Sequence, residues 1–208
     1  MEFTPSLLFS ALRRFLIDQL RPYEDYNHIH VTEVCQCLRK AWFNRKRGDA
    51  KTLKHLSDSK CVVLSYGLAL HHVLAEYLSR DSKFRAEEPI EYKISDELIL
   101  CGRADLIGDS SVVEFKTCRK VPERPYEHHL MQINAYLHMY GKSTGYLVYI
   151  SAYGDVKVFD VCRSEELWRA VVLRAEKLRK YLISDELPPP ERSKLCEYCE
   201  WKFHCAQE

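Results

Sequence analysis

The sequence predicts a mixed α/β fold of the α+β type, in which helices flank a central sheet. Apolar residues recur at helical spacing in the first third of the chain and again near its end, whereas the middle alternates apolar and polar residues with the period of β-strands. A chain of 208 residues is long enough for one full domain and a small appendage. We place the domain at 1–190, with a helical part at 1–60 and a core at 61–185, and the appendage at 191–208.

Three helices are expected in the first 80 residues. Thr4 and Pro5 suit the N-cap and the first position of a helix. Thr32 is expected to cap a second helix, which Gly48 ends. The expected ranges are 5–20, 33–47 and 59–80.

The third of these helices carries two neighbouring histidines. His72 shares a polar face with Ser65 and Glu76, whereas His71 lies within an apolar stripe. A lone histidine in such a stripe is more often a core residue than a ligand. The stripe consists of Leu64, Leu68, His71, Ala75 and Leu78.

Strands and two further helices follow. An antiparallel meander is expected over 86–94, 97–107 and 112–117, with Pro89 placing its first strand at an edge. Gly141 stops a helix over 126–140, and a hairpin joins 144–153 to 156–161. Ser164 starts a long helix that reaches about residue 182. Three prolines at 188–190 then separate the core from a cysteine-rich tail.

The stretch from Cys101 to Lys116 predicts a hairpin that gathers charged side chains. If Ile107 pairs with Val112 across the polar turn, the antiparallel register puts Asp105 directly opposite Glu114 on the same face. Strand alternation adds Lys116 to that face and turns Val113 and Phe115 to an apolar underside.

Two facing carboxylates repel each other unless a cation lies between them. Hard oxygen ligands suit Mg²⁺ or Mn²⁺, which polarise a phosphoryl oxygen and lower the pKa of a bound water. Lys116 is placed to orient that water or to stabilise charge on a phosphate. The alternative is an ordinary cross-strand ion pair on an exposed hairpin.

Charge limits how the chain can meet a nucleic acid. The formal net charge is +1, from 31 basic and 30 acidic residues, which excludes a polycation that coats nucleic acid by charge alone. Cations outnumber acids seven to one across residues 39–54, and Trp42 and Phe43 are interleaved with them. This run is either a solvated face or part of a groove for a single strand, with rings for bases. The candidate DNA contacts are Arg39, Lys40, Arg45, Lys46 and Arg47.

The nine cysteines fall into two groups. Four of them lie singly in apolar surroundings and are expected to be buried core residues: Cys61, Cys101, Cys118 and Cys162. Cys196, Cys199 and Cys205 lie within ten positions, and a fourth thiolate can come from Cys35 or Cys37. Such a set can hold an iron-sulfur cluster or zinc, with His204 as an alternative zinc ligand, and a disulfide is the weakest interpretation.

The compartment expected from the sequence is the cytoplasm. The N-terminal apolar stretch is broken by Arg13 and Arg14 and is not followed by a small-residue cleavage site. No run approaches 18 apolar residues, so no membrane span is expected. Nine cysteines without a secretion signal fit a reducing compartment.

Four motifs occur in the order found in one nuclease family. Gly67-x-x-x-His71 and Gln132-x-x-x-Tyr136 are expected on helices, and Gly102-Arg103-Ala104-Asp105 and Glu114-x-Lys116 on strands. The series resembles the RecB-like branch of the PD-(D/E)xK nuclease superfamily. The resemblance implies a restriction-endonuclease-like core with a central mixed or antiparallel sheet, and phosphodiester hydrolysis.

The resemblance also implies roles for the site residues. His71, Asp105, Glu114 and the main-chain carbonyl of Phe115 would hold Mn²⁺ or Mg²⁺. Lys116 would be catalytic, with Gln132 and Tyr136 positioning the lysine and the phosphate; these two lie four residues apart and so share a helix face.

The cysteines extend the resemblance to CRISPR-associated exonucleases with an iron-sulfur cluster. In that family the first cysteine is followed by Pro-Arg and a basic or aromatic run, and Cys37-Leu38-Arg39 matches with leucine in place of proline. The resemblance therefore favours Cys37, with Cys35 as runner-up, and a 4Fe-4S cluster over 2Fe-2S. The cluster would complete the 191–208 segment by joining it to Cys37.

The resemblance implies a DNA exonuclease that acts on single strands or overhangs, chiefly 5′ to 3′, and trims fragments for CRISPR spacer acquisition. Its partners would be the adaptation integrase and the small companion subunit of that integrase. Two alternatives stay open: a RecB-like nuclease of DNA repair or of a virus, and a non-catalytic DNA-binding scaffold with an iron-sulfur or zinc site.

Overall fold

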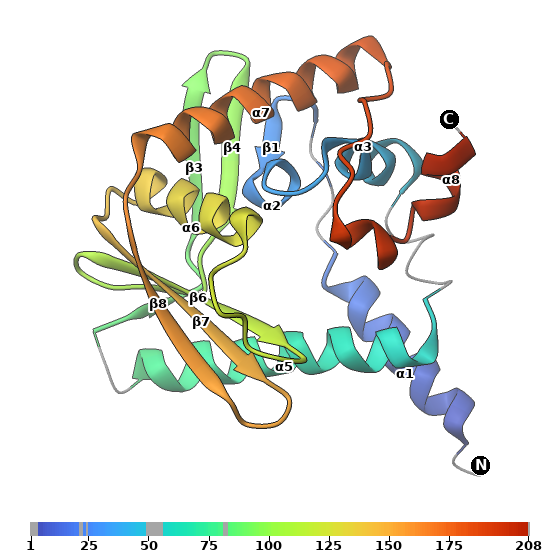
Figure 1. Ribbon diagram of the computed structural model, residues 1–208, viewed down its shortest axis with the longest axis vertical. Coiled ribbons are helices and arrows are strands. Elements are labelled where there is room, and N and C mark those ends of the chain that lie inside the picture. Colours follow the sequence, from blue (N-terminus) through green and yellow to red (C-terminus); the bar gives the residue numbers. More distant parts are fainter. Residues whose placement is uncertain (1–3, 21–22, 24, 49–55, 81–82, 208) are drawn as a thin grey trace.

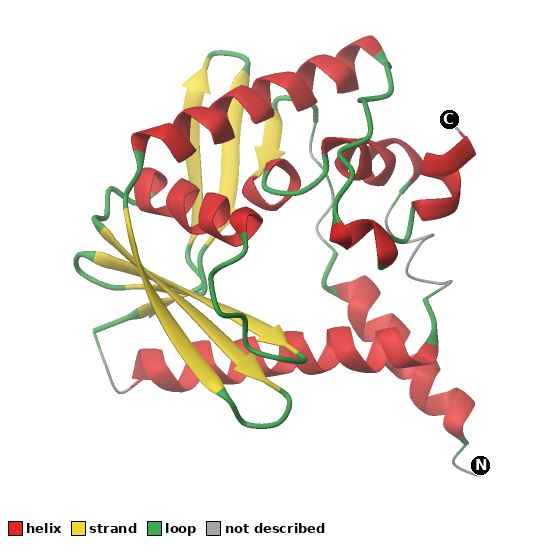
Figure 2. Cartoon of the chain, viewed as in Figure 1, coloured by secondary structure: helices red, strands yellow, loops and turns green. Residues whose placement is uncertain are grey.

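A computed structural model describes residues 4–20, 23, 25–48, 56–80 and 83–207. Figure 2 shows strands flanked by helices, as the predicted fold class requires. The cations Lys51 and Lys54 of the basic run lie outside the described residues. The helices are α1 (Pro5–Asp18), α2 (Val31–Val34), α3 (Leu38–Arg47), α5 (Asp58–Arg80), α6 (Glu127–Met139), α7 (Glu165–Ser184), the 3₁₀-helix η1 (Lys194–Glu197) and α8 (Lys202–Gln207). The strands are β1 (His28–His30), β2 (Arg85–Ala86), β3 (Pro89–Ser95), β4 (Leu98–Arg103), β5 (Leu106–Ile107), β6 (Ser111–Cys118), β7 (Thr144–Ser151) and β8 (Val156–Cys162).

The strands form two sheets. One has the order β2-β5-β6-β7-β8, with β6 parallel to β7 and the other neighbours antiparallel. The other has the order β1-β4-β3, which leaves β3 and its Pro89 at an edge as predicted. The expected continuous strand 97–107 is wrong, because Ala104 and Asp105 interrupt it and send β4 and β5 into different sheets.

Helices cover the five-stranded sheet on both faces (Figure 1). α5 lies along one face, where Ala75 packs with Leu106, Val113 and Phe115. α6 and α7 lie on the other side, over the larger core, which also includes Trp201 from the C-terminal segment. The charged face of β6 is therefore turned toward α6, and its apolar underside toward α5.

Several helix ends confirm the predicted capping residues. Thr4 Oγ1 accepts a hydrogen bond from Leu7 N at 3.3 Å, and Ser164 Oγ accepts one from Leu167 N at 3.3 Å. Gly141 follows α6 with a φ of +65°, a conformation that disfavours any residue with a Cβ.

The predicted second helix is wrong in two respects. Its N-cap is His30 rather than Thr32, which lies inside α2. The helix also stops at Val34 and restarts at Leu38, with extended backbone at Cys37. The carbonyls of Val34 and Gln36 accept hydrogen bonds from Arg174 of α7, so tertiary partners replace the helical amides at this break.

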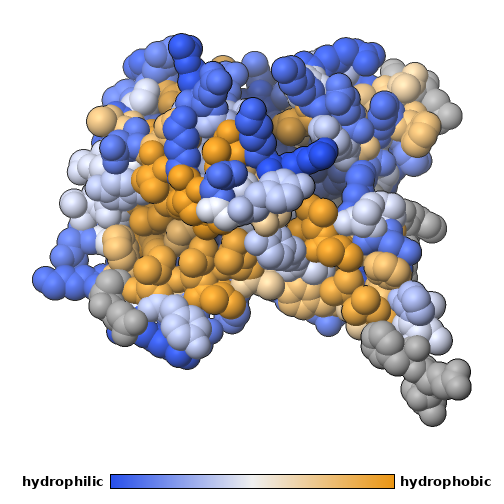
Figure 3. Space-filling model, turned by 60° about the horizontal axis from the view of Figure 1, so that its bottom comes forward, coloured by the Kyte–Doolittle hydropathy of each residue, from blue (hydrophilic) through white to orange (hydrophobic). Residues whose placement is uncertain are grey.

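The buried face of α5 also differs from the expected stripe. Leu64, Leu68 and Leu78 are more than 40% exposed, whereas Ser65, which was assigned to the polar face, is buried. The exposed apolar surface is broad (Figure 3). By length and composition α5 is apolar enough to cross a membrane, with a mean hydropathy of 1.3 over an 18-residue window. The sequence alone predicts no membrane span, because no run of apolar residues approaches that length.

Candidate functional site

Asp105 lies at the break between the two sheets. The predicted register is confirmed, because Ile107 pairs with Val112 and Leu106 with Val113. The ladder ends there, so Asp105 is not paired with Glu114 as expected. Its Oδ2 instead accepts a hydrogen bond from the backbone N–H of Phe115 at 2.7 Å. The break thus lets the carboxylate reach across to β6.

Glu114 and Lys116 share one face of β6, as strand alternation predicts. Lys116 Nζ donates to Glu114 Oε2 at 2.9 Å and to Gln132 Oε1 of α6 at 2.9 Å. Two acceptors on different elements hold the ammonium group in place. The structure therefore brings together three of the predicted catalytic residues.

Tyr136 lies behind Gln132 rather than at the surface of the site. It is 2% exposed, and burial raises the pKa of its hydroxyl well above the ordinary value. A Cβ at Gly102 would lie 2.5 Å from Tyr136 Cε1, which explains why a glycine stands in that motif. Tyr136 therefore supports the helix face that presents Gln132.

His71 reaches the site from α5. Its Nδ1 lies 3.4 Å from Asp105 Oδ2, and its ring stands edge-on to Phe115 with centroids 6.1 Å apart. One turn earlier, a Cβ at Gly67 would lie only 2.8 Å from Thr117 Oγ1. The glycine lets α5 cross close over β6, and this close crossing delivers His71 to the acids.

Glu114 is buried, with 2% of its surface exposed. Burial raises the pKa of its carboxyl to about 7, with the negative charge of Asp105 acting in the same direction and Lys116 opposing it. Among the described residues, Glu114 Oε1 has no hydrogen-bond partner. A buried oxygen without a partner, beside a second carboxylate and an imidazole, fits a site for a divalent cation.

The candidate metal ligands are of a suitable kind, but their atoms do not converge on one position. Within the described ranges, no three histidine, cysteine or acidic side chains converge closely enough to hold an ion as they stand. The residues that would hold it are His71, Asp105 and Glu114. When bound, the ion would polarise a phosphoryl oxygen and lower the pKa of a water. Lys116 and Gln132 would fix the position of the attacked phosphate, and Lys116 would stabilise its developing charge.

A second cluster, which we call the cysteine cavity, has a volume of about 560 Å³. Five cysteines line it, from two ends of the chain: Cys35, Cys37, Cys196, Cys199 and Cys205. Ser193 N lies 3.4 Å from Cys196 Sγ, and Arg39 Nη1 lies 3.8 Å from Cys205 Sγ. Hydrogen bonds to the sulfurs are a feature of thiolate-held clusters, although no three cysteines of the described ranges converge closely enough to hold a metal as they stand.

The two N-terminal cysteines differ in their surroundings. Burial raises the pKa of the Cys35 thiol to about 12, and this thiol also feels the charges of Lys116 and Glu114. Cys37 lies near Cys199. Burial is the main cause that raises the pKa of the Cys199 thiol, and the neighbouring Cys37 raises it further. Cys37 thus faces the C-terminal thiols, whereas Cys35 lies toward the carboxylate site.

His204, the alternative zinc ligand, does not line the cysteine cavity. Its ring contacts Trp201 and Phe43, with centroids 5.4 and 6.4 Å away. Of the four cysteines expected in the core, Cys61 is buried, Cys101 and Cys118 are half-buried, and Cys162 is exposed. The core assignment of Cys162 is therefore wrong, because it ends the edge strand β8.

The basic run is largely engaged inside the protein. Arg39 Nε donates to Pro188 O at 2.6 Å, and Arg45 forms a buried ion pair with Glu33 at 2.6 Å. Lys40 pairs with Glu200, Lys46 with Asp185, and the Arg47 guanidinium lies over the Phe43 ring. Trp42 and Phe43 are buried, so the alternative in which these two rings stack on bases is wrong. Contact between DNA and these five cations stays a prediction.

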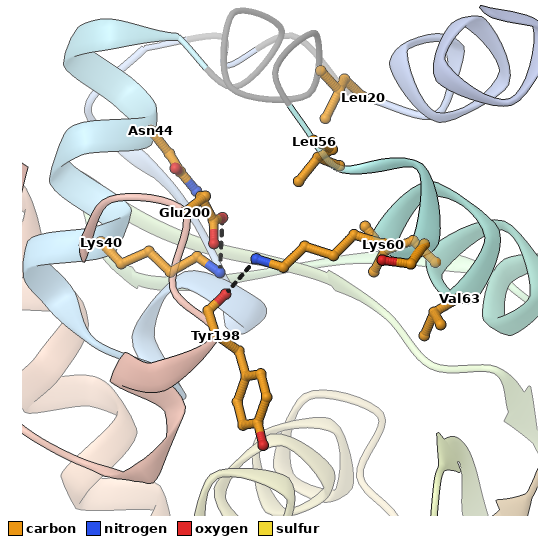
Figure 4. A pocket seen from close by; sticks show the side chains of 10 residues that line it. Leu20, Lys40, Asn44, Leu56, Lys60, Val63, Tyr198 and Glu200 are labelled. Carbon is orange, nitrogen blue, oxygen red and sulfur yellow. Dashed lines mark hydrogen bonds and ion pairs between the residues drawn. The ribbon is translucent and has the colours of Figure 1, made fainter. Parts of the chain in front are cut away.

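A second cavity of about 570 Å³ lies between α3, α5 and the C-terminal segment. Lys40, Tyr198 and Glu200 line both cavities. Lys60 Nζ of α5 donates to Tyr198 O at 3.2 Å, beside the ion pair of Lys40 and Glu200 (Figure 4). Residues 198–200 therefore separate the two cavities and tie the C-terminal segment to α5.

Sequence reasoning missed Arg174. This side chain binds the carbonyls of Val34 and Gln36 and pairs with Glu191 at 2.7 Å, so it joins the Cys35–Cys37 loop to the segment that leads to Cys196. In the sequence it is one of several cations on an amphipathic helix. Only its tertiary partners distinguish it from the others.

The fold and the site define a class: a metal-dependent phosphodiesterase in which two acids and a lysine meet on a sheet flanked by helices. A family model described as the PD-(D/E)XK nuclease superfamily matches residues 10–206. The chain belongs to that superfamily, and it is a nuclease. The predicted fold and enzyme class are confirmed. Like other members of the superfamily, it uses a divalent metal.

Individual relatives agree with this assignment. The CRISPR-associated exonuclease Cas4 of Saccharolobus solfataricus is 26% identical over 204 residues, which cover 93% of this chain and 95% of that protein. The crystal structure of SSO0001 superposes with a TM-score of 0.72 at 22% identity, covering 98% of this chain and 96% of the other. The alkaline exonuclease LHK-Exo of Laribacter hongkongensis gives 0.55 at 12% identity, covering 88% and 95%. The two structures show the shared fold.

Proposed function

We propose that this nuclease is a metal-dependent DNA exonuclease that trims single-stranded DNA or overhangs during CRISPR spacer acquisition. The observation that carries the proposal is the gathering of Asp105, Glu114 and Lys116 at β6, where Glu114 Oε1 has no hydrogen-bond partner among the described residues. Similarity to a CRISPR-associated exonuclease over 93% of the chain supports the biological setting. The proposed partners are the adaptation integrase and its small companion subunit, and the proposed location is the cytoplasm.

The chemistry follows from the site residues. His71, Asp105, Glu114 and the Phe115 carbonyl hold Mn²⁺ or Mg²⁺. Gln132 keeps the Lys116 ammonium directed toward the face that it shares with Glu114, where the scissile phosphate binds. Cleavage at a strand end and a chiefly 5′ to 3′ direction are part of the proposal.

We propose further that Cys37, Cys196, Cys199 and Cys205 hold an iron-sulfur cluster, with 4Fe-4S favoured over 2Fe-2S. Support comes from their position around one cavity and from the nitrogen donors near two of the sulfurs. Cys35 is the less suitable ligand, because burial makes its thiolate costly. The cluster would fasten the C-terminal segment to the start of α3.

The test uses linear and circular single-stranded DNA with Mn²⁺, with the linear strand labelled at either end. Stepwise loss from the 5′ end of the linear strand, with the circle intact, is the expected result. Asp105→Ala should be inactive, and His72→Ala should serve as a control because His72 is exposed beside His71 and faces Glu76. Equal degradation by wild type and Asp105→Ala would refute the proposal and favour a non-catalytic scaffold.

The setting needs a separate experiment. The purified protein is mixed with a CRISPR adaptation integrase, and prespacer ends are sequenced after integration. The CRISPR role is supported if wild type shortens the ends of the integrated prespacers and Lys116→Ala does not. Trimming of free DNA without any effect on integrated fragments would favour a repair or viral nuclease.

A further inference from the structure

Four rings gather at the start of α6, one turn before Gln132. Tyr126 stacks on His128 at an interplanar angle of 15°, with centroids 5.7 Å apart. The ring centroids of His128 and His129 are 4.0 Å apart, and those of His129 and Tyr149 are 5.5 Å apart. Tyr126 also stands edge-on to His129 and Tyr149. We call these four residues the ring cluster.

Tyr149 fixes the ring cluster beside the site. It is the register partner of Lys116 in the parallel pair of β6 and β7, and it is fully buried. The Tyr149 hydroxyl accepts a hydrogen bond from Tyr126 N at 3.1 Å and lies 2.8 Å from His129 Nδ1. The rings are thus held in a set position relative to Lys116.

The two histidines of the ring cluster resist protonation. Burial lowers the pKa of His129 to about 2, and burial also lowers the pKa of His128, with the positive charge of Lys116 adding to both effects. Neutral rings attract a phosphate less than cations would. Their flat faces suit a nucleobase instead, because every base has a π-face that stacks on an aromatic ring.

One side of the ring cluster is accessible to a ligand. Tyr126 is 47% exposed. His128 lines the cysteine cavity, and the positive charge of Lys116 is near enough to lower the pKa of that histidine. His128 therefore lies both at the cavity and near Lys116.

We propose that Tyr126 and His128 form a stacking platform for one nucleobase of a single DNA strand, close to the phosphate that Lys116 addresses. This inference rests on the proposed function, because it assumes that single-stranded DNA enters the site. It explains how the enzyme would position a strand without a sequence preference. Tyr149 and His129 act as positioning residues for the platform.

The experiment measures binding of an oligo-dT strand in EDTA, where no cleavage occurs, by fluorescence anisotropy. Tyr126→Ala is expected to weaken binding about tenfold, the size typical of one lost stack. Tyr126→Phe keeps the ring and should bind like wild type. Tyr153→Ala removes a ring that is 77% exposed in the turn between β7 and β8, and should have no effect.

An abasic scan adds the decisive comparison. In a series of strands that each lack one base, we expect one strand to bind wild type more weakly than the others do. The same missing base should not weaken the binding of Tyr126→Ala any further. Wild-type affinity in Tyr126→Ala, or equal abasic effects on both proteins, would overturn the platform. If the melting curve of Tyr126→Ala shows that the variant does not fold, the abasic scan on wild type alone tests the platform. Equal affinity of wild type for every abasic strand would overturn the platform.

Failure of the proposed function is distinguishable from failure of the platform. A wild-type protein that neither binds nor cleaves single-stranded DNA refutes both. A wild type that binds and cleaves, with variants that do the same at equal affinity, refutes the platform alone.

Discussion

The carboxylate site and the cysteine cavity are built in opposite ways. In the first, side chains already hold one another: Lys116 is bonded to Glu114 and Gln132, and Asp105 to the Phe115 amide. In the second, Cys37 and the C-terminal thiols line an open cavity and depend on residues such as Arg174 to bring their segments together. The difference indicates that the catalytic geometry belongs to the sheet, whereas the cysteine cavity is held by contacts between segments that lie far apart in the chain.

The largest expected effect is on catalysis. Lys116→Ala should lower the cleavage rate by about 10³-fold, because it removes a fixed cation from the developing phosphate charge. The melting temperature should change by only a few degrees, and Lys142→Ala, on an exposed turn, is the control. A variant that retains a tenth or more of the wild-type rate on end-labelled DNA would show that the lysine is not catalytic.

The cysteine cavity should respond in stability. Cys199→Ser is expected to remove the brown absorbance at about 400 nm and to lower the melting temperature by roughly 3 °C for each kcal/mol of lost ligand binding. Cys162→Ser changes an exposed thiol outside the cavity and should keep both properties. If wild type is colourless and contains zinc, the cluster proposal is wrong.

The carboxylate site should also show a pH dependence of stability. Folding raises the pKa of Glu114 from 4.5 to about 7. Between these two pH values the folded state therefore binds the Glu114 proton more tightly than the unfolded state does. The free energy of unfolding of the metal-free protein should therefore fall as pH rises through this window, by up to about 3 kcal/mol. Urea titrations in EDTA at pH 5 and pH 8 measure it.

The matched variant for that prediction is Glu114→Gln, which lacks the titrating carboxyl and should lose this part of the slope. Mn²⁺ should stabilise the wild type more at pH 8 than at pH 5, because the ion competes with the proton for Glu114. A slope that is the same in both proteins would assign the pH effect to other groups.

The smallest expected effect comes from the close crossing of α5 and β6. Gly67→Ala places a methyl group 2.8 Å from Thr117 Oγ1, so either α5 or the Thr117 side chain must shift. A loss of about 1–3 kcal/mol in stability and a larger loss of metal affinity are expected, because His71 moves with the helix. Calorimetry with Mn²⁺ on Gly67→Ala alone and with Thr117→Ala added tests it, since the second change should restore both.

Much of the fold was predictable because local patterns carry it. The caps at Thr4 and Ser164, the glycine after α6 and the register of Ile107 with Val112 depend on neighbours in the chain. The second helix was mispredicted because Arg174, far away in sequence, takes over the carbonyls at its break. The apolar stripe of α5 was misassigned because a helix apolar on several sides does not indicate which side meets the sheet.

The amino-acid sequence specifies the candidate residues of the site: two acids, a lysine and a histidine in the order of a nuclease family, and cysteines at the two ends of the chain. How these residues meet depends on the tertiary structure. Asp105 reaches β6 because the strand breaks before it, and Arg39 and Arg45 turn inward because buried partners claim their guanidinium groups. The ring cluster beside Lys116 exists only because the parallel pairing of β6 with β7 places Tyr149 there. Such contacts join residues far apart in the chain, and no local spacing encodes them.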